Sequence, residues 1–111
     1  MAFKLVKQLK KVEWPVRIKV PTDGGKTEEH EFTGVFKLLP QTEYDENTKS
    51  KKSDAEFIGE ILVGCKGLLD DDGEEIEFSP EVVAQLCEYP FTRIAIFKAY
   101  NEIVTGIEVK N

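Results

Sequence analysis

The sequence from Phe57 to Val104 reads FIGEILVGCKGLLDDDGEEIEFSPEVVAQLCEYPFTRIAIFKAYNEIV. Its apolar segments, broken by glycine and proline, predict a helix, an acidic turn, a second helix and a longer third helix. Ser79-Pro80-Glu81 is typical of a helix start, because it places a hydroxyl at the N-cap, a proline at the first helical position and an acid in the first turn. The stretch contains no recognisable catalytic constellation, so we interpret it as a helical platform.

The boundaries of the first helix follow from local signals. Ser53 is expected to be its N-cap, with Glu56 three residues later forming a capping box. Gly64 and Gly67 are expected to end it, as glycine often does just past a helix. The polar residues 41–53 before it are interpreted as a connection with a helical turn, outside the core.

Alternating residues nearer the N-terminus predict a β-hairpin. Every second residue is apolar from Val12 to Val20, and a similar pattern runs from Phe32 to Leu38, as expected of half-buried strands. The segment Pro21 to Lys26 contains an Asp-Gly pair and is the expected turn. Pro15 lacks a backbone donor, so we expect it at a sheet edge or at the start of a strand.

Together these patterns predict an α+β fold, in which an N-terminal antiparallel β-hairpin or small sheet is followed by three to four C-terminal helices packed against it. A lone hairpin is marginally stable in water, and the helices are the available cover for its apolar face. A length of 111 residues predicts a single domain. The hairpin part is expected within residues 1–40 and the helical part within residues 53–106.

Composition narrows the classes of function. Hydrophobic residues make up 41% and charged residues 32% of the chain, as in ordinary folded proteins. The formal net charge of −6 disfavours nucleic-acid binding. No apolar run is long enough for a membrane span, and residues 1–7 lack the apolar region of a signal peptide. We therefore expect a cytoplasmic protein with neither nucleic acid nor membrane among its partners.

The charge is unevenly placed along the chain. Residues 1–26 carry seven basic and two acidic side chains, whereas residues 27–111 carry eight basic and nineteen acidic ones. One explanation is chance on a solvated surface. The other is a basic edge and an acidic body that meet different partners or steer one encounter.

The sequence contains no complete motif for phosphate, calcium or zinc binding or for catalysis. Gly25-Lys26-Thr27 lacks the earlier glycine of a phosphate-binding loop, and the acidic turn at Gly73 lacks the first and last ligands of a calcium loop. His30 lies among glutamates with no nucleophile nearby, and Cys65 and Cys87 are too few for a structural zinc site. We therefore expect no enzyme activity, no catalytic residue, no cofactor and no metal.

The last helix, expected from Phe91 or Thr92 to Thr105, is apolar on two sides. One line of residues contains Ile94, Phe97 and Val104, and an offset line contains Ile96, Tyr100 and Ile103. A helix with a single buried face needs fewer apolar positions than this. Either the helix is central and covered on both sides, or one line is left to bind another protein.

The chain resembles the small tail assembly chaperones of long-tailed, siphovirus-type bacteriophages and prophages. The similar features, in order, are Phe36-Lys37-Leu38-Leu39-Pro40-Gln41, the segment Phe57 to Leu62 leading to Val63-Gly64-Cys65-Lys66-Gly67-Leu68, Asp70-x-Asp72-Gly73, Phe78-Ser79-Pro80-Glu81, and Tyr89-Pro90-Phe91-Thr92-Arg93 before Ala95, Ala99 and Tyr100. They cover most of the chain. Cys65 departs from the pattern, because similar sequences have a tryptophan there.

This resemblance implies a non-enzymatic assembly factor that is absent from the finished virion. It would transiently bind the tape measure protein, keep its apolar helices from aggregating and recruit the tail tube protein. The alternative is a structural tail or head–tail joining subunit that stays in the virion. For a protein-binding role we expect contacts at Phe91, Ile96, Tyr100 and Ile103; self-association stays open.

Overall fold

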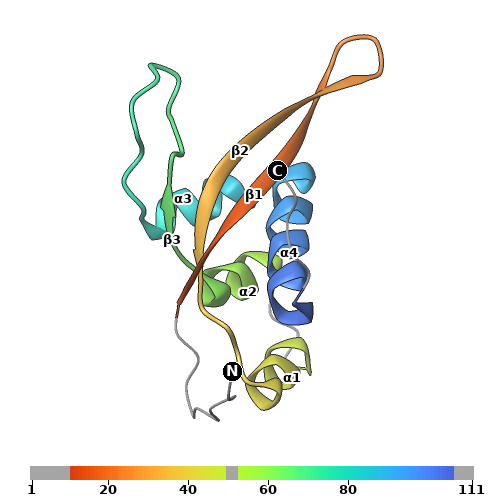
Figure 1. Cartoon of the computed structure of the whole chain (residues 1–111), viewed down its shortest axis with the longest axis vertical. Coiled ribbons are helices and arrows are strands. Elements are labelled where there is room, and N and C mark those ends of the chain that lie inside the picture. The colour runs from red at the N-terminus through yellow and green to blue at the C-terminus, as the bar shows by residue number, and fades with distance from the viewer. Residues whose placement is uncertain (1–10, 50–52, 107–111) are drawn as a thin grey trace, which may run out of the picture.

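The computed structural model describes residues 11–49 and 53–106. It shows an α+β arrangement of one three-stranded antiparallel sheet and four helices (Figure 1), which confirms the predicted fold class. The elements in chain order are β1 (Val12–Thr22), β2 (Lys26–Phe36), α1 (Gln41–Lys49), α2 (Asp54–Ile61), β3 (Leu62–Lys66), α3 (Pro80–Leu86) and α4 (Pro90–Thr105).

The predicted hairpin is formed by β1 and β2. Its register is continuous from the pair Val12 and Phe36 to the pair Thr22 and Lys26. The turn between the strands uses Gly24 and Gly25 at φ values of 81° and 75°, a left-handed conformation that glycine adopts without a steric penalty. The far ends of both strands and this turn extend beyond the helices (Figure 1), and residues 21–31 are all exposed.

Alternation along the hairpin separates a buried face from a solvated one. Val16, Phe32 and Phe36 are buried on the inner face. On the outer face Arg17 Nε lies 3.1 Å from Glu31 Oε1, its cross-strand partner. The period-two pattern of the sequence therefore identified the correct faces.

One edge of the sheet is β1, and Pro15 lies within this strand, as predicted. Pro15 and Pro21 are an even number of residues apart, so their backbone nitrogens face the same side of the strand. Because proline has no N–H group, both fit an edge that receives no neighbouring strand.

The third strand was not predicted. The first helix of the platform ends at Ile61, and the next five residues form β3, which pairs antiparallel with β2; the expectation that this helix continues to Gly64 is therefore wrong. Leu62 already has the extended conformation, with φ −98° and ψ 107°. Gly64 fits the ladder because a Cβ built there would lie 3.2 Å from Val35 Cβ, a close approach that glycine avoids.

The polar connection after β2 also differs from the prediction, because Gln41–Lys49 forms a full helix, α1, rather than a turn. This helix contacts the rest of the protein through an edge-to-face pair between Tyr44 and Phe57, with ring centroids 5.6 Å apart. Helix α1 was not predicted because its residues are mostly polar and show no periodic pattern of apolar positions.

The N-cap signals at Ser53 and Ser79 were correct, whereas Gly64 and Gly67 do not cap a helix. The Ser53 hydroxyl accepts a hydrogen bond from the Glu56 N–H at 3.2 Å, and the Ser79 hydroxyl accepts one from the Val82 N–H at 3.3 Å. Helix α4 ends at Gly106 with φ 73°. The two serines satisfy backbone donors at helix starts, and the Gly106 N–H donates to the carbonyls of Glu102 and Ile103 at the end of α4.

The core lies between the sheet and the helices. Helix α4 packs along β1, while α2 contacts α3, α4 and β3. The side chains with the least exposure are Val16, Phe36, Ile58, Ile61, Leu62 and Ile96. At the margin of this core the Trp14 Nε1–H donates to Glu102 Oε1 at 3.3 Å, which links β1 to the last turns of α4.

Candidate functional site

Two of the four expected contact residues lie in the core. Ile96 is fully buried and Tyr100 is 4% exposed. The Tyr100 ring packs against Phe36 and Phe57, with ring centroids 6.3 and 6.4 Å away. Neither side chain is available to a partner in this conformation, so their assignment to a surface is corrected here: both hold α4 against the rest of the protein.

The other two expected residues are at the margin of the core. Phe91 and Ile103 are half-buried and pack against it. The Phe91 ring stacks on the exposed ring of Tyr89, with centroids 5.5 Å apart and an interplanar angle of 17°. Part of each side chain therefore remains accessible beside the start and the end of α4.

The other line of α4 is more exposed to solvent. Ile94 is 65% exposed and Val104 is 51% exposed, with half-buried Phe97 between them in sequence. We call these three residues the outer row. The spacing of apolar residues found both lines, but which of them faced the core depended on packing that sequence does not show. The outer row is a candidate contact surface that the expected set of four residues missed.

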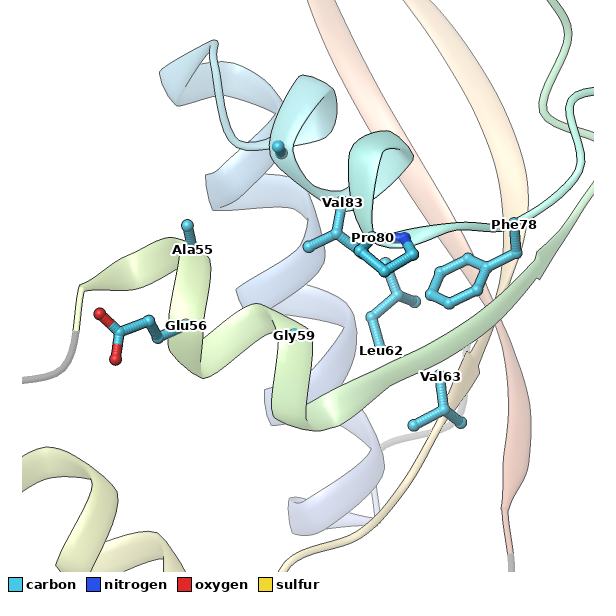
Figure 2. A pocket seen from close by; sticks show the side chains of 9 residues that line it. Ala55, Glu56, Gly59, Leu62, Val63, Phe78, Pro80 and Val83 are labelled. Atoms are coloured by element: carbon cyan, nitrogen blue, oxygen red, sulfur yellow. The ribbon is translucent and has the colours of Figure 1, made fainter.

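A second apolar surface is a groove between α2, β3 and α3 of about 480 Å³. Figure 2 shows Leu62, Phe78, Pro80 and Val83 gathered between α3 and β3, with α2 forming the other wall. The complete lining is Ala55, Glu56, Gly59, Leu62, Val63, Phe78, Pro80, Val83 and Ala84. None of these residues belongs to α4, so the groove is separate from the outer row.

Small side chains keep the groove open. Ala55, Gly59 and Ala84 are exposed along its helical walls, whereas Leu62 and Val83 are buried at its base. A Cβ built at Gly59 would meet no atom within 4 Å. The groove was not predicted from the sequence. The feature that could have indicated it is the occurrence of small residues on the outer faces of the two helices.

The groove lies in an acidic environment. Its nine lining residues span positions 55–84, a segment that contains nine acidic side chains and one basic side chain, Lys66. On the two helical walls and just beyond them the exposed acids are Asp54, Glu56, Glu60, Glu81 and Glu88. Among the residues that the structure describes, Arg93 is a cation beside these acids, with its Nε 3.7 Å from Asp54 Oδ2. A positively charged partner would therefore be attracted to this side of the protein.

The two thiols are poorly suited to nucleophilic chemistry. Both cysteines are free; Cys87 is buried and Cys65 is half-buried. Burial raises the pKa of each thiol above the ordinary value of 9.0, and Glu75 adds to this effect at Cys65. Each is therefore mainly protonated near neutral pH, and the thiol is a weaker nucleophile than the thiolate.

The acidic turn is organised by its own backbone. Asp70 Oδ1 accepts hydrogen bonds from the N–H groups of Asp72 and Glu74 at 2.9 and 3.0 Å. Gly73 completes the turn with φ 81°. Across residues 11–49 and 53–106, no group of three or more His, Cys, Asp or Glu residues is placed to hold a metal ion.

The four helices of the described chain include none with the length and apolar character needed to cross a bilayer. No family model matches the chain, and comparison with curated proteins and with solved structures finds no significant match. Hypotheses about function therefore depend on the sequence features and on the two apolar surfaces described above.

Proposed function

We propose that this protein is a phage tail assembly chaperone: a non-enzymatic, transient binder of the tape measure protein that recruits the tail tube protein. The proposal is supported by the sequence resemblance, whose segments run from Phe36 to Tyr100. It is also supported by apolar side chains that the folded protein leaves exposed. Such side chains are what a chaperone needs to shield the apolar helices of a client.

The observation that carries the proposal is the exposure of Ile94 and Val104 on α4, at 65% and 51%. They are ten residues apart, so on a straight helix about 15 Å separates them along the axis. A client helix lying along α4 would contact both. Because Ile96 and Tyr100 anchor the helix in the core, exposed Ile94 and Val104 can bind and release a client without unfolding.

Co-expression tests this function. The tape measure protein encoded in the same gene cluster is produced with this chain and assayed for solubility and co-purification. Wild type should keep the client soluble, and the double variant Ile94→Lys, Val104→Lys should not. The matched control, Lys98→Glu, changes an exposed residue of α4 outside the outer row. Client solubility that is the same with and without this chain would refute the proposal.

The alternative role, as a permanent structural subunit, requires a lasting contact between copies. A β-strand contact at the free edge of β1 is disfavoured by Pro15 and Pro21, which lie on that strand. Mass spectrometry of purified particles separates the two roles, because a structural subunit is present in them and a chaperone is missing.

A further inference from the structure

The groove between α2, β3 and α3 has the dimensions of a site for a short stretch of helix. Its walls are α2 with eight residues and α3 with seven, each about 11–12 Å long at a rise of 1.5 Å per residue. That length corresponds to about two helical turns, over which a partner helix places apolar side chains at positions i, i+4 and i+7. A lining of alanine, glycine, leucine, valine, phenylalanine and proline is suited to receiving them.

The surrounding charge selects the kind of helix. The groove segment, residues 55–84, has nine acidic side chains against one basic side chain, and Glu56 lies in the lining itself. We call the exposed acids on and beside the helical walls the acidic rim; they are Asp54, Glu56, Glu60, Glu81 and Glu88. Arg93 offsets the acidic rim at one point, where its Nε lies 3.7 Å from Asp54 Oδ2. A negatively charged helix would be repelled from this rim, and a helix flanked by lysine or arginine would be attracted to it.

We infer that the groove binds a positively charged amphipathic helix, which inserts its apolar side chains between α2 and α3 and places its basic side chains against the acidic rim. The inference rests on the proposed function in that the helix is taken to belong to the client. It adds a second binding surface, separate from the outer row, and specifies the chemistry of the segment that the surface selects.

Direct binding of synthetic peptides tests the groove without any phage protein. Three peptides of about 18 residues, long enough to form a helix, are compared by fluorescence anisotropy. The first has leucines at helical spacing and lysines elsewhere; the second replaces the lysines with glutamates; the third keeps the lysines and replaces the leucines with serines. We expect binding of the first peptide, weakened by added salt, and no saturable binding of the other two.

A substitution at Gly59 connects binding to the groove. A side chain there points into open space, because its Cβ meets no atom within 4 Å, so Gly59→Arg fills the groove and adds a repelling charge. We expect it to weaken binding of the leucine–lysine peptide about tenfold or more, as unfavourable contacts at the centre of an interface do. Gly59→Ala should bind within about twofold of wild type, because one methyl group leaves most of the groove open.

Two controls exclude other causes. Asn101→Arg places the same charge on an exposed position of α4 and should leave peptide binding unchanged. Urea unfolding should show that Gly59→Arg is at least as stable as wild type, since arginine favours helices more than glycine does. A loss of binding in Gly59→Arg with retained stability therefore reports on the groove.

Several outcomes overturn the inference. If the leucine–glutamate peptide binds as tightly as the leucine–lysine peptide, the groove does not select for positive charge. If the serine–lysine peptide binds as tightly as the leucine–lysine peptide, net charge alone explains the attraction. Unchanged binding in Gly59→Arg places the site elsewhere. Concentration-dependent self-association that Gly59→Arg abolishes would assign the groove to a second copy. The two proposals fail separately. Client solubility that is lost only with the outer-row variant, while Gly59→Arg behaves as wild type, refutes the groove and keeps the chaperone role. Client solubility that is the same with and without this chain refutes the chaperone role, and the peptide titration still tests the groove.

Discussion

The hydroxyl oxygen of Tyr100 accepts a hydrogen bond from the backbone N–H of Leu39 at 3.1 Å, across 61 residues of sequence. Leu39 follows β2, and Tyr100 lies within α4, so this bond ties the chain leaving the hairpin to the last helix. Both residues are buried. The donor therefore has no access to water if the tyrosine oxygen is removed.

Tyr100→Phe should destabilise the protein while keeping its fold. The ring contacts are retained, but the buried Leu39 N–H loses its acceptor, which costs about 1–3 kcal/mol. Urea denaturation should show this loss in the free energy of unfolding. The matched control is Tyr89→Phe, at a ring that is 57% exposed, for which a change within about 0.5 kcal/mol is expected. Equal effects of the two substitutions would contradict the role assigned to the Leu39 bond.

The same hydroxyl predicts a dependence of stability on alkaline pH. Burial raises the pKa of Tyr100 above its ordinary value of 10.0, although the hydrogen bond from Leu39 acts in the opposite direction. The unfolded chain then loses this proton at a lower pH than the folded chain does. The folded state consequently binds more protons above pH 10, and stability falls as pH rises from there.

Urea midpoints measured at several pH values between neutral and strongly alkaline should decline more steeply for wild type than for Tyr100→Phe. The comparison isolates Tyr100, because all other titrating groups are shared by the two proteins. Parallel pH profiles would show that Tyr100 titrates alike in the folded and unfolded states.

Local signals in the sequence predicted much of the architecture. Ser53 and Ser79 were identified as caps because a hydroxyl before an acidic first turn has a direct role at a helix start. The hairpin faces followed from strict alternation. These features depend on residues close together in sequence, and their physical causes act at the same range.

Longer-range packing determined what the sequence could not predict. Leu62 to Lys66 became a strand because β2 offered a free edge for pairing, an effect of tertiary context that overrides local preference. The two apolar lines of α4 are equivalent by periodicity, and contact with Phe36 and Phe57 selected the line of Tyr100 as the inner one. The groove was not predictable because it is formed by three elements that sequence reasoning did not bring together.

The two lines of α4 should respond differently to the same substitution. Ile96→Lys buries a charge at a fully buried site, which should destabilise the protein by more than about 4 kcal/mol or prevent folding. Ile94→Lys, two residues away at a site that is 65% exposed, should change the free energy of unfolding by no more than about 0.5 kcal/mol. Circular dichroism during urea unfolding compares them, and similar losses would contradict the assignment of inner and outer lines.

Two glycines should respond in opposite directions to alanine. At Gly34, on β2, a Cβ would lie 2.7 Å from a ring carbon of Phe36 and 3.1 Å from a methyl carbon of Leu62. Phe36 and Leu62 are among the most buried side chains and have little room to move. We expect Gly34→Ala to lower the free energy of unfolding by about 1–3 kcal/mol, the usual cost of overpacking a core.

At Gly59, inside α2, a Cβ meets no atom within 4 Å. Alanine there restricts the unfolded chain and favours the helix, so Gly59→Ala should raise the free energy of unfolding by about 0.5–1 kcal/mol. Both values come from one urea titration series, and each variant is the control for the other because the same methyl group is added. Destabilisation by Gly59→Ala would mean that the wall of the groove is more tightly packed than the structure shows, and the space assigned to a partner helix would then be lost.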